Sequence, residues 1–392
     1  MVKRKDSIRN ILNVIYRYGP VSRAAIADKL KLTIPAVTVN ITSLVESGLI
    51  GSSPAPLEEP ALGRPKQLLD FVPSAWFTAG IDVGPYATYC CVSDIRGRVA
   101  VSEEYPICPG DYSEAVEFIA ETLDAVIAKS GISPSSLAGV GIGTPGFVDT
   151  DKGLLRHSTM HSWGNVMLAR DVEALTGYPV VMENNARCRS LAVSMLEDRT
   201  LPDTYAYLYV AKGIACPVRI GNKDFPGTMS AAGEIGHMIM DKDGPVCPTC
   251  SHRGCLEALS SERAVTRAVQ GLVKEGKTDF PFQEDIGIND VLMAAGNGDE
   301  EIWKILDKAM LYLGLALANT INLLNPGLVL VDGYMMRMER NRAVMLKVAR
   351  DNLFALDITD VDIRFVDFDK LRTARGAAAK AIERFVLEEE KG

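Results

Sequence analysis

A group of thiols in the second half of the chain has the spacing of a metal site. Cys247, Cys250 and Cys255 fall within nine residues, and His237 precedes them by ten positions. One imidazole and three thiolates form a closed tetrahedral set that suits structural zinc and leaves no position open for catalysis. Buried thiols without a ligand are a weaker explanation for cysteines so close together. His252 lies inside the same segment and is the competing fourth ligand.

The other cysteines have no such spacing and are predicted to pack as small apolar side chains. They are Cys90, Cys91, Cys108, Cys188 and Cys216. The basic amino terminus lacks the apolar core of a signal peptide, and the apolar stretch from Leu311 to Leu324 is shorter than the roughly 20 residues of a membrane span. We therefore expect a cytoplasmic protein without a membrane partner and without a disulfide framework.

Four short motifs follow one another in a specific order. They are Gly143-Thr144-Pro145-Gly146, Glu183-Asn184-Asn185-Ala186, Gly233-Glu234-Ile235-Gly236-His237 and Gly254-Cys255-Leu256-Glu257. With them the chain resembles, over nearly its whole length, the ROK family of bacterial repressors and sugar kinases. The resemblance implies an α/β fold, an actin-like or hexokinase-type pair of lobes. In the repressor branch an α+β winged helix-turn-helix precedes these lobes.

The resemblance also implies which residues bind a sugar. Asn184, Glu234, His237 and Glu257 match the family's contacts to sugar hydroxyls, and Gly146 and Asn185 are predicted to bind the ligand with them. A zinc-bound imidazole has a fixed tautomer and orientation, so its second ring nitrogen is preorganised for a sugar. Carboxylates and amides suit sugars because they bond vicinal hydroxyls in pairs. For Asn184 or Glu234 taken alone, the alternative is a buried polar residue of a turn. Together with the order of the motifs, this alternative is the weaker explanation.

The residues that a sugar kinase needs for phosphoryl transfer are altered. In family kinases an Asp follows the site Asn and takes the hydroxyl proton, whereas here that position is Asn185, which cannot act as a base. The first phosphate loop reads Asp82-Val83-Gly84-Pro85-Tyr86, in which proline removes a backbone donor. The second loop, residues 211–216, and the late pair Asp332-Gly333 also depart from the kinase pattern. We therefore expect no enzyme, and the alternative is an ATP-dependent sugar kinase with an added DNA-binding domain.

The ligand side departs from the family pattern as well. The segment from Cys247 to Cys250 has one residue more than the usual Cys-x-Cys, and Ser251 stands where glycine is usual. Basic residues flank the predicted cleft and could bind an anionic sugar, although such residues more often form solvated surface. They are Arg156, His157, His161, Arg187 and Arg189.

The amino-terminal residues have the pattern of a helix-turn-helix. Apolar residues at helical spacing predict a first helix over residues 7–18. Ser22 is predicted to cap a helix that runs through Leu30, and Thr33 to cap a third helix that begins at Ile34. Two short helices joined by so tight a turn match a DNA-binding unit, and two strands around a Pro-rich tip then predict a wing.

The charge and position of residues in this amino-terminal head, residues 1–73, indicate how it would bind DNA. Residues 1–70 carry 10 Lys and Arg against 6 Asp and Glu, whereas the rest of the chain carries 32 against 44. Arg64 in the wing could enter a minor groove and Lys66 could meet phosphate. The predicted DNA-binding residues are Ser22, Arg23, Thr33, Pro35, Ala36, Thr38, Asn40, Arg64 and Lys66. The third helix has no Lys or Arg, so a protein-binding helical bundle is the alternative.

Alternating strands and helices predict two α/β lobes after this head. The predicted domains are residues 1–73 for the winged helix-turn-helix, 74–190 for the first lobe with residues 376–392 packed back on it, and 191–375 for the second lobe with the zinc knuckle. Two lobes leave a cleft that suits a small ligand. The function that we expect is a sugar-controlled transcriptional repressor, a homodimer or homotetramer on a double-stranded, pseudo-palindromic operator.

Overall fold

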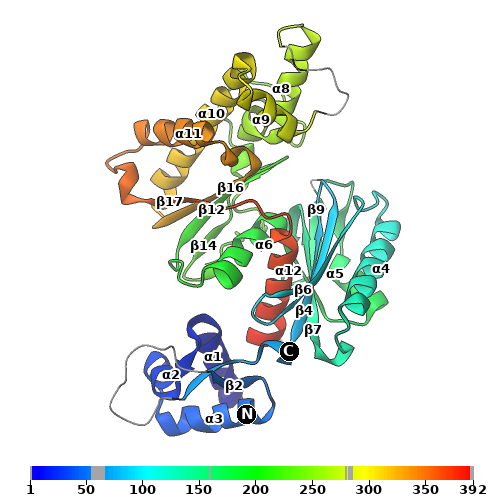
Figure 1. The fold of residues 1–392 in the computed structure, drawn as a ribbon, viewed down its shortest axis with the longest axis vertical. Helices are drawn as coiled ribbons and strands as arrows, with labels where there is room; N and C mark the ends of the chain where they lie inside the picture. Colours follow the sequence, from blue (N-terminus) through cyan, green and yellow to red (C-terminus); the bar gives the residue numbers. More distant parts are fainter. Residues whose placement is uncertain (1, 54–66, 159, 279, 281–285, 389–392) are drawn as a thin grey trace. The chain divides into compact units, whose positions relative to one another are not determined.

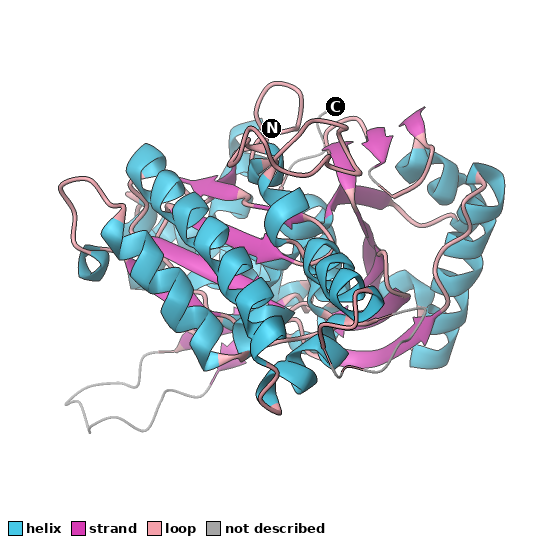
Figure 2. Ribbon diagram, turned by 90° about the horizontal axis from the view of Figure 1, so that it is seen from above, coloured by secondary structure: helices cyan, strands magenta, loops and turns pink. Residues whose placement is uncertain are grey.

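The computed structural model describes residues 2–53, 67–158, 160–278, 280 and 286–388. The chain forms two compact units, Met1–Thr200 with Lys370–Gly392, and Leu201–Asp369. Each unit mixes helices and strands, as Figure 2 shows by colour. The predicted lobe boundaries at residues 190 and 376 lie inside helices α6 (Asn185–Ala192) and α12 (Arg372–Ile382). The chain leaves the first unit only after Thr200 and returns to it at Lys370.

The first unit begins with the predicted head of three helices and a small sheet. The helices are α1 (Val2–Tyr18), α2 (Arg23–Leu30) and α3 (Ile34–Glu46). Ser22 Oγ accepts a hydrogen bond from the Ala25 amide and Thr33 Oγ1 from the Ala36 amide, so both predicted caps are present. Strands β1 (Val21–Ser22), β2 (Ile50–Ser53) and β3 (Leu68–Phe71) pair antiparallel in the order β1-β3-β2. This arrangement confirms the predicted α+β head.

The rest of the first unit is built on a mixed sheet in the order β11-β7-β4-β5-β6. Its strands are β4 (Phe77–Val83), β5 (Thr88–Asp94), β6 (Val99–Tyr105), β7 (Leu137–Thr144) and β11 (Val180–Asn184). Its further elements are α4 (Tyr112–Ser130), β8 (Gly146–Asp149), β9 (Leu154–Ser158), β10 (Gly164–Val166), α5 (Leu168–Thr176) and α6. The carboxyl-terminal helix α12 packs on β4 and β7 (Figure 1). Residues Lys370–Gly392, which include this helix, belong to the first compact unit.

The second unit has a sheet in the order β15-β14-β12-β16-β17, with β13 paired to β12. Its strands are β12 (Tyr205–Val210), β13 (Ile214–Ala215), β14 (Val218–Ile220), β15 (Lys223–Asp224), β16 (Leu328–Gly333) and β17 (Asp362–Phe365). Its helices are α7 (Leu256–Ser260), α8 (Glu262–Lys274), α9 (Ile288–Gly296), α10 (Glu300–Leu324) and α11 (Glu339–Asp351). The apolar face of α10 lies at the centre of this unit's core. Across the residues described, no helix is both long and apolar enough to cross a membrane.

Candidate functional site

The predicted metal ligands come together in the second unit. The ligand atoms of His237, Cys247, Cys250 and Cys255 all lie within 4.8 Å of one another. The Sγ atoms of Cys250 and Cys255 are 3.4 Å apart, and His237 Nδ1 is 3.9 Å from Cys247 Sγ. The competing candidate His252 is exposed and does not belong to this group. Four soft donor atoms at such short range can hold one metal ion.

Burial and mutual hydrogen bonds shift the pKa values of the three thiols in this group. Burial, together with a hydrogen bond to Cys250 and the charges of neighbouring thiols, raises the pKa of Cys255 to about 12. Burial also raises the pKa of Cys247. For Cys250 burial raises the pKa as well, but hydrogen bonds with the His252 backbone and with Cys255 outweigh it, and the pKa falls to about 6. A metal cation would stabilise all three thiolates, because a coordinated thiol loses its proton outright.

A tight loop shapes this cluster. Ile239 forms an antiparallel bridge with Cys255. Between the cysteines, Gly254 has a φ of 68°, and a Cβ at this position would lie 1.5 Å from the Asp241 carbonyl oxygen, so only glycine fits. Ser251 has a φ of 63°, also in the left-handed region, which explains why glycine is usual there in the family.

Glu257, a predicted sugar contact, is hydrogen-bonded by the loop of residues 247–255, called here the metal loop because it carries the three cysteines. Thr249, between Cys247 and Cys250, donates from Oγ1 to Glu257 Oε1 at 2.5 Å. The Ile214 amide lies 3.4 Å from Glu257 Oε2, and the residue is only 7% exposed. The fold of the metal loop therefore orients this carboxylate. The sequence analysis missed the role of Thr249, for which its place inside the Cys-x-x-Cys segment was the available signal.

Glu234 and His237 belong to one short turn of the same unit. Glu234 directly precedes η4 (Ile235–His237), and the His237 amide donates to its carbonyl oxygen at 3.1 Å. Both side chains are half-buried. His237 directs Nδ1 toward Cys247 Sγ, which leaves Nε2 as the ring nitrogen for another partner. The second unit thus carries three of the predicted sugar contacts next to the metal cluster or linked to it.

Asn184, in the first unit, caps helix α6. Its Oδ1 accepts from the amides of Ala186 and Arg187 at 2.9 and 3.2 Å, and its Nδ2 donates to the Gly146 carbonyl oxygen at 2.9 Å. Gly146 has a φ of 127°, and a Cβ there would lie 2.1 Å from the His157 carbonyl oxygen. Asn184 therefore has a structural role as the cap of α6, and one Nδ2 hydrogen is left over for a ligand.

The position of the kinase base and the first phosphate loop also lie in the first unit. Asn185 is the first residue of α6, and its Oδ1 accepts from the Ala186 amide at 2.9 Å. Burial raises the pKa of Asp82 to about 7, although Arg189 and a hydrogen bond from Thr373 lower it. Asp82 Oδ1 has no hydrogen-bond partner among the described residues. Asp82 thus lies buried near the end of β4, whereas Tyr86, in the loop that follows this strand, is 46% exposed.

Two of the basic residues near the predicted cleft are internal, which corrects the expectation of solvated surface. Arg187 and Arg189 are each 4% exposed. Arg187 Nε lies 2.9 Å from Glu183 Oε1, a buried ion pair. Arg156 Nη2 lies 2.5 Å from Asp149 Oδ2. The Glu183 carboxylate supplies the opposite charge that the buried Arg187 guanidinium needs.

The exposed face of α3 differs from the prediction at one position. Asn40 is 7% exposed, and its Nδ2 donates to the Ala36 carbonyl oxygen and to Ser7 Oγ, so the prediction that it faces DNA was wrong. It shares the buried face with Val37, Ile41 and Leu44, at the spacing of one helix side. Val39 is exposed instead, at 57%, and Pro35 and Ala36 are exposed as predicted.

The other residues that were predicted to contact DNA differ in their structural surroundings. Ser22 and Thr33 act as helix caps, and Thr38 is half-buried. Arg23 Nη1 donates to Gln67 Oε1 at 2.8 Å and so ties α2 to the residue before β3. Arg64 and Lys66 lie outside the described residues.

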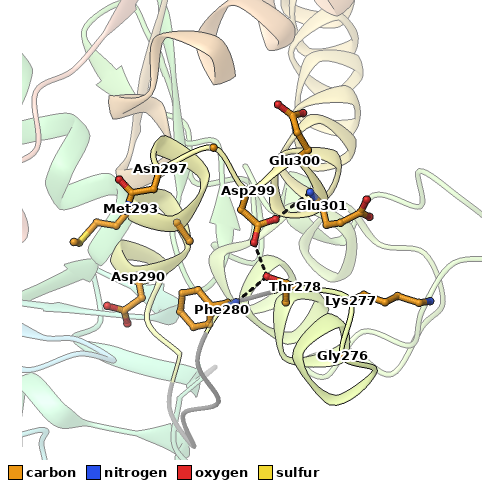
Figure 3. Close-up of a pocket in the computed structure, with 12 residues that line it drawn as sticks. Gly276, Lys277, Thr278, Phe280, Asp290, Met293, Asn297, Asp299, Glu300 and Glu301 are labelled. Carbon is orange, nitrogen blue, oxygen red and sulfur yellow. Dashed lines mark hydrogen bonds between the residues drawn. The ribbon is translucent and has the colours of Figure 1, made fainter.

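A hollow of about 820 Å³ lies in the second unit, at the ends of α8 and α9 and the start of α10 (Figure 3). None of the predicted sugar contacts lines it. Asp299, one of its carboxylates, caps α10 through the Glu301 and Ile302 amides and accepts from Thr278 Oγ1 at 2.5 Å. This acid therefore has a structural role in starting the helix.

Comparison with known proteins relates both parts of the chain to described families. The sequence profile of the ROK family matches residues 78–384, and that of a winged helix-turn-helix DNA-binding domain matches residues 4–50. The xylose repressor of Bacillus subtilis (strain 168) is 25% identical over 333 residues, 84% of this chain and 82% of the repressor. A glucokinase of Halalkalibacterium halodurans is 26% identical over 264 residues, 66% of this chain and 80% of the kinase.

The fold has a near full-length counterpart among solved structures. The crystal structure of a ROK family transcriptional regulator, a homologue of the E. coli MLC protein, superposes with a TM-score of 0.84 at 22% identity and covers 98% of both chains. The glucokinase matches a smaller share of this chain than the repressor does. The similarity to the regulator structure thus extends over the amino-terminal head as well as the two lobes.

Proposed function

Because this chain belongs to the ROK family and carries a winged helix-turn-helix ahead of its ROK domain, we propose that a sugar or sugar derivative controls its binding to operator DNA. It would act as a repressor of carbohydrate genes, as the name of its xylose repressor relative suggests. The observation that carries the proposal is the head itself, in which α2 and α3 are capped, joined by a tight turn and backed by a sheet. Such a head has no role in phosphorylating a sugar.

The effector would be bound through hydroxyl groups. Glu257 is held by Thr249, and His237 is oriented by the cysteines, so both groups are positioned before a ligand arrives. Glu234, Asn184, Asn185 and Gly146 complete the proposed set. Binding of the sugar would shift the population away from the DNA-competent conformation, because a ligand favours the state that it binds better.

We propose zinc as the ion of the cysteine cluster, in a structural role. Four ligands at about 2.0–2.3 Å in a tetrahedron place their donor atoms about 3.5–3.8 Å apart. The pairs Cys250–Cys255 and His237–Cys247, at 3.4 and 3.9 Å, are close to these separations. His237, Cys247, Cys250 and Cys255 would hold the ion and occupy every tetrahedral position. The ion would fix the loop that carries Thr249 and, through it, Glu257.

We propose that the chain does not transfer phosphate. An amide at Asn185 cannot accept the hydroxyl proton, and the buried Asp82 keeps its own proton up to about pH 7. The second candidate function is an ATP-dependent sugar kinase, which the similarity to a glucokinase favours. ATP-dependent phosphorylation of xylose or glucose by the purified chain would support the kinase. No phosphorylation of either sugar by the chain would support the regulator.

The experiment that tests the proposal combines DNA and sugar binding. Labelled duplexes tiled across the DNA that flanks the protein's own gene are titrated with full-length protein, at one fixed salt concentration. A panel of free and phosphorylated sugars is screened by thermal shift, because a ligand of the native state raises the melting temperature. We expect one fragment to bind tightly and one sugar to change that affinity. Binding to no fragment, or no effect of any stabilising sugar, would contradict the proposal.

Variants localise the sugar site. Glu257→Gln and Glu234→Gln are expected to lose the sugar-dependent thermal shift, because one hydroxyl acceptor loses its charge. The control Glu275→Gln, at an exposed position of the same unit, should keep it. Two heads per operator are expected for a pseudo-palindromic site, so we propose a homodimer or homotetramer that acts in the bacterial cytoplasm, where the operator is.

A further inference from the structure

The second helix of the helix-turn-helix presents an apolar, uncharged face to solvent. On α3, Val39 is 57% exposed and Ile34 53%, whereas Val37 on the opposite face is fully buried. Between Thr33 and Ser47 the chain has no Lys, Arg or His, and its single acid is Glu46. An exposed valine of this extent in the middle of a short helix is not explained by the core of the head.

The polar side chains of α3 are largely occupied within the head. Thr38 Oγ1 donates to the Ile34 carbonyl oxygen at 2.8 Å, and Thr42 Oγ1 donates to the Thr38 carbonyl oxygen at 2.9 Å. Asn40 is turned inward. Guanine is usually read by Arg, and adenine by the amide of Asn or Gln. None of these side chains is available on the exposed face of α3.

The exposed face of α3 can still contact a base through the methyl groups of its apolar side chains. In the major groove the base edge with an apolar group is thymine, through its 5-methyl. Val39 is β-branched, so one side-chain rotamer dominates in a helix and its methyl groups are held in place. Ala36 lies one turn before it on the same side, at the spacing i, i+3.

We infer that Val39, supported by Ala36, is a specificity-determining residue that reads thymine methyl groups in the operator. The inference rests on the proposed DNA-binding function and deepens it. Sequence preference would arise from the fit of methyl to methyl, while the contacts of the wing and of the basic head with phosphate would contribute affinity without selecting bases. The half-site read by α3 should therefore contain thymine at one or two fixed positions.

The test begins with the full chain and a pool of duplexes that have a randomised centre. Bound duplexes are selected and sequenced, and each thymine of the consensus is then replaced in turn by uracil, which lacks only the 5-methyl. We expect uracil at one or two positions per half-site to weaken binding about fourfold, the effect of removing one buried methyl-sized group. Uracil elsewhere should have no effect.

Variants assign the contact to one side chain. Val39→Ala should weaken binding to the thymine duplex and lose its sensitivity to uracil at the same positions. Val45→Ala is the matched control, because Val45 is also exposed on α3 but points to another side of the helix. It should keep the sensitivity to uracil. Both valines are exposed, and alanine favours helix, so both variants are expected to fold.

The outcomes separate this inference from the proposed function. Two outcomes would overturn the inferred contact with thymine and leave DNA binding intact. One is a consensus that tolerates uracil at every position, and the other is a Val39→Ala variant that is as sensitive to uracil as the original chain. A pool from which no sequence is enriched overturns the DNA-binding function and the inference together.

Discussion

Arg96, in the turn between β5 and β6, donates a hydrogen bond from Nη1 to the carbonyl oxygen of Tyr16 at 2.8 Å. The same guanidinium pairs with Asp70 and lies over the ring of Phe71. Arg199 also donates to the Tyr16 carbonyl oxygen, at 2.9 Å. These contacts join the end of α1 and strand β3 of the head to the first lobe, and the apolar core of the head continues into residues of that lobe.

Removing the Arg96 side chain should destabilise the amino-terminal head. In Arg96→Ala, Asp70 loses its partner and the end of α1 loses a donor, at a cost of about 1–3 kcal/mol. We expect faster amide hydrogen exchange in α1 and β3 and a melting temperature lower by a few degrees. Arg98→Ala, at an exposed position of the same turn, is the control. Equal exchange in both variants would show that Arg96 does not hold the head.

The cysteine cluster should bind one zinc ion per chain. His237→Ala and Cys250→Ser are expected to lose the metal, whereas His252→Ala, at the exposed histidine, should keep it. Elemental analysis of protein purified without chelator gives the stoichiometry. Chelation should also lower the melting temperature, because the loop that holds Glu257 loses its support. A His252→Ala variant without metal would contradict this ligand set.

Asp82 should make stability depend on pH. In the unfolded chain its pKa is near 3.8, whereas burial raises it to about 7 in the folded protein. Between about pH 4 and about pH 7, Asp82 therefore takes up a proton when the chain folds. Its contribution to the free energy of unfolding is present at low pH and is lost as the pH rises through this range, by up to about 1.4 kcal/mol per pH unit.

Substitution isolates that contribution. Asp82→Asn resembles the protonated residue and should lose less thermal stability than the original chain between pH 5 and pH 7.5. Asp124→Asn, at an exposed position on α4 of the same unit, should follow the original chain. Parallel melting curves for the original chain and Asp82→Asn would rule out a raised pKa in the folded state.

The buried pair of Glu183 and Arg187 should show non-additive energetics. Arg187→Met leaves the Glu183 carboxylate buried, with Lys380 Nζ 3.8 Å from its Oε2 among the described residues. We expect a loss of about 3–5 kcal/mol, as for other broken buried pairs. The double variant Glu183→Gln with Arg187→Met should regain much of it, and denaturant melts of all three variants measure the coupling. Additive losses would mean that the two groups do not interact.

The local features of this protein could be predicted from its residues. Ser22 and Thr33 cap their helices as predicted, because a cap depends on a side chain and an amide only three residues away. The cluster of His237 and three cysteines that could hold a metal was found for the same reason, since three of its four members lie within nine residues. The motif order also identified the family, and with it the α/β lobes and the α+β head.

Which polar groups form internal contacts depends on how distant segments of the chain pack. Asn40 turns inward because its helix packs with residue 40 on the buried side, and this depends on the position of α1. Arg187 is buried because α6 packs inside the first unit, and Thr249 meets Glu257 through the fold of the metal loop. Arg96 meets Tyr16 across 80 residues. Such contacts depend on packing between distant segments, which no local pattern of residues encodes.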